Sequence, residues 1–270
     1  MATNEAGTRH RAPARHAAPL LAYVLHQYDW SETSLIVELF TRAQGRVVVA
    51  AKGAKRPTSN FRALLLPFQP VLAQLGKTPS DEHGEVHNLR SAEWAGGQPL
   101  LDAAAMLSGY YANELVLKLL ARQDPHPGLF DAYADTLAAL AGGEEEPVVL
   151  RAFELLLLRE LGLLPDLAMA TLTTEPVRSA GRYTLHPEAG VILDDMGLAG
   201  SEWVGLEAAL VHAGASGNAA ALRQACAGVA TPLRGPLRSL LHYHLGHTPL
   251  RTRQVRQGVQ RLCETLPLNP

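Results

Sequence analysis

Apolar and β-branched runs separated by turns fill the first third of the chain. Leu20 to Tyr28, Thr33 to Thr41 and Arg46 to Lys52 each have the composition of a strand, and a Gln44-Gly45 turn joins the second to the third. A fourth run follows at residues 69–75. The pattern therefore predicts strands and tight turns here, with no helix.

A fifth strand is expected at residues 85–90. Five short strands within roughly 75 residues predict a small closed β-barrel over residues 20–94. The oligonucleotide/oligosaccharide-binding (OB) fold is the leading candidate, and the strand count leaves an SH3-like barrel open.

The periodicity becomes helical after Gly96-Gly97, because apolar residues now recur every three or four positions. We predict a helical domain over residues 95–270. The run at 147–161 is apolar nearly all round, as expected for the central helix of a bundle. The expected helices span residues 102–122, 129–140, 147–161, 201–212, 218–227, 233–245 and 250–265.

A polar stretch interrupts these helices. Residues 171–193 contain Gly181, Gly190 and two short β-type pieces, which predict an irregular hairpin inserted at about 170–196. The chain as a whole is therefore predicted to be α+β, a barrel followed by helices.

Charge is divided into three blocks that the overall net charge of −2 conceals. Residues 1–62 carry nine Lys or Arg against four Asp or Glu, residues 63–207 carry eight against 21, and residues 208–263 carry seven Arg and no acid. This predicts two basic surfaces on an acidic body. Residues 1–19 form the start of the first block and are predicted to be a disordered basic tail.

Other bulk features suggest a cytoplasmic protein. No run of 18 apolar residues exists, so no membrane span is predicted. Cys226 and Cys263 lie far apart and are expected to be free thiols rather than a disulfide. We expect no cofactor and no enzyme activity, because neither a phosphate-binding glycine loop nor a nucleophile motif is present.

A cluster of cations follows the second and third strands. Several Lys and Arg on one surface are suited to a nucleic-acid backbone, because each neutralised phosphate releases a counterion. The other interpretation is a solvated barrel rim that binds nothing. Base-stacking candidates are few (Phe40, Phe61 and Phe68), and all three could equally be core residues. The candidate phosphate contacts are Arg42, Arg46, Lys52, Lys55, Arg56 and Arg62.

The arginines near the C-terminus form a possible second DNA surface, unless they pair with the acidic body. They are Arg234, Arg238, Arg251, Arg253 and Arg256. A His242-x-His244-x-x-His247 run invites a metal site, but a helix would separate His242 from His244 by about 160° and no acidic or thiol ligand is near in sequence. We therefore expect no metal. A metal bound at these histidines would make a hydrolytic enzyme an alternative again.

Ordered short motifs run through the chain from about Leu20. They are Tyr23-Val24-Leu25-His26, Ser31-Glu32-Thr33-Ser34-Leu35, Gly45-Arg46, Lys52-Gly53-Ala54-Lys55-Arg56, Pro67-Phe68-Gln69-Pro70, Tyr111-x-Asn113-Glu114-Leu115, Asp124-Pro125-His126-Pro127 and Pro249-Leu250-Arg251-Thr252-Arg253. In order and spacing the chain resembles the RecO family of bacterial DNA repair proteins, which are recombination mediators.

The resemblance implies an OB barrel with a helical body, binding of single- and double-stranded DNA, and annealing of complementary strands. It also implies contact with the C-terminal tail of single-stranded DNA-binding protein, and help, together with RecR, in loading RecA. Such proteins act in the cytoplasm on the nucleoid. Zinc-bearing relatives carry two Cys-x-x-Cys pairs in the insert; Ala170 and Thr173 stand at the first pair here and residues 191–196 hold no Cys, so the insert is expected to bind no zinc.

We predict a non-catalytic mediator that binds DNA. The rival is a protein adaptor whose barrel binds an acidic partner and for which DNA is irrelevant. For the tail, an acidic peptide ending in Pro-Phe, we predict a site at Lys118, Arg122 and Leu115, because these residues put two cations beside an apolar side chain on one helix face. Arg151 and Arg159 are the competing cations.

Overall fold

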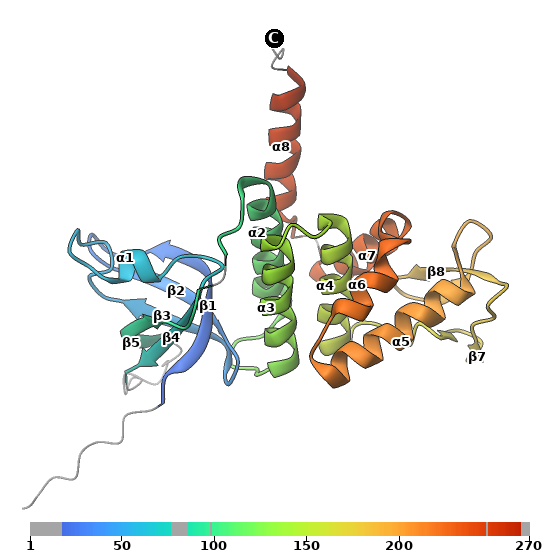
Figure 1. Cartoon of the computed structure of the whole chain (residues 1–270), viewed down its shortest axis with the longest axis horizontal. Coiled ribbons are helices and arrows are strands. Elements are labelled where there is room, and N and C mark those ends of the chain that lie inside the picture. Colours follow the sequence, from blue (N-terminus) through green and yellow to red (C-terminus); the bar gives the residue numbers. More distant parts are fainter. Residues whose placement is uncertain (1–17, 77–85, 98, 247, 266–270) are drawn as a thin grey trace, which may run out of the picture.

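A computed structural model describes residues 18–76, 86–97, 99–246 and 248–265. The barrel lies at one end of an elongated molecule and α2 and α3 stand beside it; α4 to α7 and the insert continue to the other end, while α8 projects away from the long axis next to α2 (Figure 1). The predicted tail at 1–19 falls, apart from Ala18 and Pro19, outside the described residues, as does the loop at 77–85.

The first half of the prediction is confirmed by a closed five-stranded barrel of OB-like fold. Neighbouring strands follow the order β1-β2-β3-β5-β4, with β4 returning to β1 and β3 parallel to β5. A short helix that the sequence pattern did not predict, α1 (Phe61–Leu64), lies between β3 and β4. The strands are β1 (Leu20–Asp29), β2 (Leu35–Thr41), β3 (Gly45–Ala51), β4 (Pro70–Leu75) and β5 (Val86–Trp94).

Alternation along β1 to β3 divides their side chains between two cores. Val24, Leu39 and Val49 point into the barrel and belong to its own apolar cluster. Their chain neighbours Tyr23 and Phe40 point outward and are buried with the helices instead. Successive side chains of a strand face opposite sides of a sheet, so one sheet supplies both cores.

The helical prediction is also confirmed, with ends shifted by a few residues. Asp102 caps the first helix of this part, because its side chain accepts a hydrogen bond from Ala105 N at 2.7 Å. The helices are α2 (Ala103–Leu119), α3 (Pro127–Ala141), α4 (Glu146–Glu160), α5 (Gly200–Ser216), α6 (Ala220–Ala227), α7 (Ala230–Leu245) and α8 (Arg251–Thr265).

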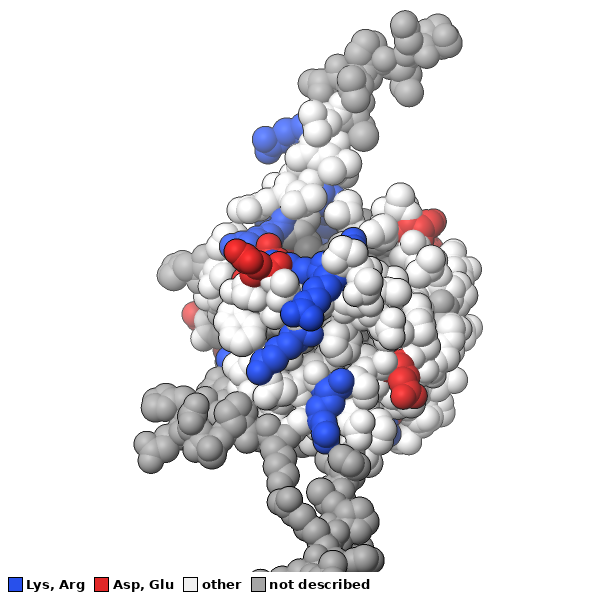
Figure 2. Space-filling view, turned by 90° about the vertical axis from the view of Figure 1, so that its left-hand side faces the viewer, with Lys and Arg blue, Asp and Glu red and all other residues white. Residues whose placement is uncertain are grey.

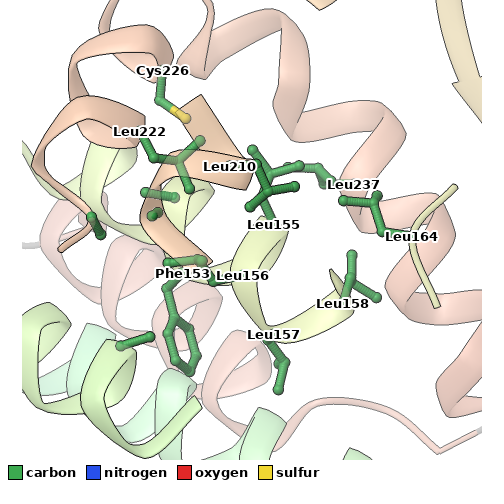
Figure 3. Packing of buried hydrophobic residues seen from close by; sticks show 14 of the residues in the cluster. Phe153, Leu155, Leu156, Leu157, Leu158, Leu164, Leu210, Leu222, Cys226 and Leu237 are labelled. Carbon is green, nitrogen blue, oxygen red and sulfur yellow. The ribbon is translucent and has the colours of Figure 1, made fainter. Parts of the chain in front are cut away.

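Helix α4 is the centre of this body, as its all-round apolar sequence predicts. Leu155, Leu156, Leu157 and Leu158 occupy successive positions and are all buried, so they cover every side of the helix. They project in different directions toward the surrounding helices, and Leu155 lies among Leu210, Leu222 and Leu237 side chains (Figure 3).

The insert between α4 and α5 is held by ordinary packing. Val177, Leu185 and Val191 are buried with the body, and Trp203 of α5 donates a hydrogen bond from Nε1 to the Tyr183 carbonyl at 3.0 Å. Its strands are β6 (Met169–Ala170), β7 (Glu175–Pro176), β8 (Arg182–His186), β9 (Gly190–Leu193) and β10 (Leu198–Ala199).

Barrel and body are joined by a shared aromatic core. The Tyr23 ring lies 5.4 Å from Phe130 and 5.1 Å from Tyr133 of α3, and Phe40 contacts the same two rings. Asn113 of α2 donates to the Leu25 carbonyl at 3.0 Å and accepts a hydrogen bond from the Tyr133 hydroxyl. The joint is therefore both apolar and hydrogen-bonded.

Gly45 allows the tip of the β2–β3 hairpin to touch the loop between α2 and α3. A Cβ at Gly45 would lie 2.0 Å from the Asp124 carbonyl oxygen, and its φ of +65° favours glycine independently. Next to it, Gln123 N donates to the Arg46 carbonyl at 2.8 Å. This contact brings β3 against the helical body and decides which cations of the hairpin remain in solvent.

Candidate nucleic-acid interface

A basic loop leaves β3 on the solvent side of the barrel. It consists of residues 52–62, and we call it the basic loop. Lys52, Arg56 and Arg62 are exposed and Lys55 is partly exposed. Viewed toward the barrel end, Lys and Arg side chains form a row across the face, with acidic side chains fewer and scattered (Figure 2). Four predicted cations therefore stand on one accessible segment.

The basic loop is fixed to the β1–β2 loop rather than hanging free. Lys55 N donates to the Thr33 carbonyl at 2.9 Å, and Gly53 N donates to the Ser34 hydroxyl at 3.3 Å. The Lys55 ammonium also binds the Ser31 carbonyl at 2.9 Å and Asp29 at 2.7 Å. Lys55 thus holds the loop in place, and Lys52, Arg56 and Arg62 are freer to meet an anion.

Arg46 does not lie on this surface, which corrects its prediction as a phosphate contact. It is 9% exposed and lies where β3 meets the helical body. Its guanidinium donates to the Leu117 carbonyl and lies 3.7 Å from Glu38, itself 3% exposed. Burial lowers the pKa of Arg46, an effect that the Glu38 charge opposes. Its donors therefore face protein.

Arg42 is likewise engaged by the body. Its Nε and Nη2 each donate to one carboxylate oxygen of Asp131 in α3, both at 2.9 Å. The hydrogen bond and the charge of Asp131 raise the Arg42 pKa. A bidentate pair uses the guanidinium edge that a phosphate would need, so we remove Arg42 from the proposed contacts.

The aromatic candidates are also corrected. Phe40 and Phe68 are buried, at 0% and 5% exposure, and Phe61 packs partly buried against the barrel core. The aromatic side chains that the barrel exposes are Tyr28, Trp30 and Trp94, at 46%, 55% and 45%. Position alone could have suggested Trp30, since it follows a predicted strand and begins a turn.

The C-terminal arginines gather around a cavity instead of forming an open surface. A cavity of about 440 Å³ lies between α2, α4, α7 and α8 and is lined by Arg234, Arg238, Arg253 and Arg256 together with Arg151 of α4. Arg256 is paired with Glu146 at 2.6 Å, so for this residue the interpretation as an internal pair holds. The Arg251 side chain is exposed, away from the cavity lining.

The electrostatics of this cavity favour an anion. Burial, followed by repulsion from Arg238 and Arg234, lowers the pKa of Arg253. Burial raises the pKa of Glu154, which accepts hydrogen bonds from Arg151 and from the Tyr111 hydroxyl, each at 2.7 Å. The cavity therefore has more positive than negative side chains, and an anion would relieve the repulsion.

A second, more apolar cavity of about 290 Å³ adjoins the first. The two share Arg238, Leu250 and Arg253 in their linings, and the second adds Leu241 and Leu245 of α7. We call the two cavities together the arginine groove. It offers guanidinium groups next to a leucine-lined hollow.

The contacts of Lys118, Arg122 and Leu115 do not favour the predicted tail site, which stays a prediction. Leu115 is fully buried and cannot receive a ring. Lys118 pairs with Glu114 at 2.9 Å and donates to the Pro249 carbonyl, while Arg122 pairs with Glu38 at 2.7 Å. Of the competing cations, Arg159 pairs with Glu207 at 2.5 Å, and Arg151 lines the arginine groove.

The described residues offer neither a metal site nor a membrane-spanning helix. No group of three or more His, Cys, Asp or Glu that could hold a metal occurs among the residues described, which leave out His247. In the same residues, no helix combines the length and apolar character needed to cross a membrane.

Comparison with known protein families assigns both halves of the chain. A family model described as "Recombination protein O N terminal" matches residues 20–97, and one described as "Recombination protein O C terminal" matches residues 100–254. The two matches cover the barrel and most of the helical body.

Curated relatives agree along nearly the full length. The chain is 50% identical to "DNA repair protein RecO" of Acidovorax ebreus over 264 residues, which is 92% of this chain and 99% of that protein. It is 49% identical to the protein of the same name in Variovorax paradoxus, over 89% of this chain and 96% of the relative, and 48% identical to that of Verminephrobacter eiseniae, over 93% and 100%.

Proposed function

The chain belongs to the RecO family of DNA repair proteins, and from this premise we propose that it is a non-catalytic recombination mediator that binds DNA through the basic loop of its barrel. In this proposal it binds single- and double-stranded DNA, anneals complementary strands and, with RecR, helps to load RecA onto DNA coated by single-stranded DNA-binding protein. It would act in the cytoplasm on nucleoid DNA.

The observation that carries the DNA-binding step is the accessible charge of the basic loop. Lys52, Arg56 and Arg62 are exposed and make none of the ion pairs found for the neighbouring cations Arg42 and Arg46. Phosphate contacts supply most of the sequence-independent affinity for nucleic acid. Backbone binding without base readout is suited to a protein that must act on any damaged sequence.

A salt titration with charge-reversed variants tests this step. Wild-type binding to a random single-stranded oligonucleotide should weaken steeply with salt, with a log–log slope of about −0.7 for each phosphate contacted. Lys52→Glu with Arg56→Glu should abolish binding and flatten the slope. Arg178→Glu with Arg182→Glu is the matched control, because both arginines are exposed on the insert and the charge change is the same.

The rival adaptor function predicts a different result. An adaptor would show no salt-sensitive DNA binding in the wild type, and both double variants would behave alike. Equal affinity of the Lys52/Arg56 variant and the wild type would remove the basic loop from the DNA site. Annealing of complementary oligonucleotides, followed by fluorescence transfer, should fail in the same variant if strand pairing uses this surface.

For the partner, we infer that the acidic tail of single-stranded DNA-binding protein docks in the arginine groove. A peptide ending in a Pro-Phe carboxylate requires a cation next to an apolar hollow. Arg238 and Arg253 border both cavities, and Leu241 and Leu245 line the apolar one. These linings support the arginine groove, rather than the helix face of Lys118 and Arg122, as the docking site of the tail.

Titration with a tail peptide tests the groove. Arg253→Glu should lower the affinity for the peptide by roughly 10- to 100-fold, which corresponds to the loss of one charge-assisted hydrogen bond of about 1.5–3 kcal/mol. Arg178→Glu is the matched control, and DNA affinity without the partner should hardly change. Unchanged peptide affinity in Arg253→Glu would place the tail elsewhere on the protein.

A further inference from the structure

Two large aromatic side chains stand in solvent at the end of β1. Tyr28 is 46% exposed and Trp30, which opens the β1–β2 loop, is 55% exposed. By contrast, the barrel buries Tyr23, Phe40 and Phe68 against the helices. Neighbouring aromatic residues left in water on a folded barrel are a feature of contact sites.

The Tyr28 ring is oriented by a neighbour. The His26 ring packs edge-on against it, with 4.5 Å between ring centroids and an interplanar angle of 72°. Both residues lie on the strand side opposite to Gln27, whose amide turns inward to the Leu65 carbonyl. An oriented ring loses less entropy when a flat ligand stacks on it.

Trp30 is held beside the basic loop. Its backbone N–H donates to the Ser34 carbonyl at 3.3 Å, which closes the turn. Lys55 of the basic loop donates hydrogen bonds to the Ser31 and Thr33 carbonyls of the same turn. Lys52 follows Ala51, which pairs with Leu35 at the start of β2. Aromatic rings and exposed cations therefore share one edge of the barrel.

We propose that Tyr28 and Trp30 form a stacking site for the unpaired bases of single-stranded DNA, with the phosphates held by the adjacent basic loop. The inference rests on the proposed DNA-binding function and adds a means of distinguishing strand type. Every base has a π-face, so stacking is tolerant of sequence. In a duplex those faces are covered by neighbouring base pairs, so only the backbone contacts remain.

Topology also favours this edge. In OB folds the face of strands 2 and 3 and the loop between strands 1 and 2 bind oligonucleotides. Here the helical body covers the β2–β3 face at Phe40 and Arg46, which leaves the β1–β2 loop end open. Tyr28 and Trp30 lie at that open end.

Three probes of equal length separate stacking from charge. They are oligothymidylate, a deoxyribose-phosphate oligomer without bases, and a duplex of mixed sequence. Wild-type protein should prefer oligothymidylate to the base-free oligomer. Trp30→Ala and Tyr28→Ala should each lower oligothymidylate affinity by roughly 5- to 100-fold, the range of base–aromatic stacking. Affinity for the base-free oligomer and the duplex should change less than about twofold.

Trp94→Ala is the matched control. Trp94 is also an exposed tryptophan, but it pairs with Val71, which in turn pairs with Ala22 near the start of β1. The rest of β1, from Ala22 to Asp29, separates that position from Trp30, a length of roughly 20 Å. This variant should bind all three probes like the wild type, and Trp30→Phe should keep most of the preference for bases.

The possible results distinguish failure of the stacking site from failure of the proposed DNA-binding function. Loss of affinity for all three probes in Trp30→Ala would show a structural role, and wild-type behaviour in the Tyr28/Trp30 double alanine variant would show that bases do not stack here. Either result overturns the stacking site while DNA binding stands. A wild-type protein that binds none of the probes would instead overturn the proposed function.

Discussion

Arg122, just beyond the end of α2, donates a hydrogen bond from Nη2 to Oε1 of Glu38 on β2 at 2.7 Å, across the joint between body and barrel. The same carboxylate lies 3.7 Å from Arg46 Nε. A single buried carboxylate therefore balances the charges of two arginines. The sequence analysis had predicted Arg46 to contact DNA and Arg122 to contact the tail peptide.

Replacing Glu38 should destabilise the whole chain. Glu38→Ala leaves Arg46 buried without its counter-charge, and removing one partner of a buried pair costs about 3–5 kcal/mol. We expect a loss near 3 kcal/mol in the free energy of unfolding measured in urea. Glu32→Ala, at an exposed acid of the β1–β2 loop, is the control and should lie within about 0.5 kcal/mol of wild type. A loss under 1 kcal/mol in Glu38→Ala would contradict this account.

Residues 18–97 expressed alone should self-associate or fail to fold. Tyr23, Leu25 and Phe40 have at most 3% exposure in the whole protein and would face water without α2 and α3. The same fragment with Tyr23→Thr, Leu25→Thr and Phe40→Thr should stay monomeric in size-exclusion chromatography, because threonine is compatible with strands. A monomeric, folded wild-type fragment would show that the joint is dispensable.

Protonation of Glu114 at acidic pH should weaken the attachment of α8 to the helical body. Glu114 accepts hydrogen bonds from Arg251 N, Thr252 N and the Thr252 hydroxyl at 2.7–2.9 Å, and so caps the start of α8. Burial acts to raise the Glu114 pKa, but the hydrogen bonds from Thr252, Arg251 and Lys118 outweigh it and leave the pKa lowered.

A lowered folded-state pKa means that the carboxylate stabilises the fold above its unfolded value of about 4.3 and loses this contribution as the pH falls through the lower folded value. Protection of the α8 amides, expressed relative to their intrinsic exchange rates, should therefore fall as the pH drops below the unfolded value. Glu114→Gln should show raised exchange at neutral pH already, with Glu175→Gln, an exposed acid of the insert, as the control. Unaltered exchange in Glu114→Gln would mean that α8 is held by other contacts.

Cys226 should be unreactive in the folded protein. Burial raises the pKa of its thiol to about 12, and the thiolate is the reactive form. In a Cys263→Ser background, a disulfide reagent at pH 8 should label Cys226 only at the rate of unfolding, and fully in 6 M guanidinium. Labelling within seconds under native conditions would contradict the burial of α6 against α4.

Strands and cations of the first block could be predicted because alternation and charge are local properties. Arg46 lies in β3, and Lys52 directly follows the end of that strand. What the sequence could not show is which of them a distant helix covers, and the Gly45–Asp124 contact decides it by bringing the body over Arg46. Two of the six predicted cations, Arg42 and Arg46, are engaged by the protein itself in this way.

The predicted tail site is disfavoured for a related reason. Spacing placed Lys118 and Arg122 on one side of α2 beside Leu115, but α2 lies between the barrel and the body and both sides are occupied. The arginine groove combines α4 with α7 and α8, which no local pattern links. Arg151, which the sequence analysis named as a competing cation, does line the groove.

The aromatic core at Tyr23 and Phe40 packs the barrel against the helical body and so sets the distance between the two proposed binding surfaces. A strand on the barrel and a tail in the arginine groove would then act as two linked sites whose effective concentration depends on the partner's own linker. A linker too short to span the gap would remove the avidity altogether, and one much longer would dilute it. The partner's linker length, rather than any hinge in this chain, would then set how efficiently DNA passes from one protein to the other.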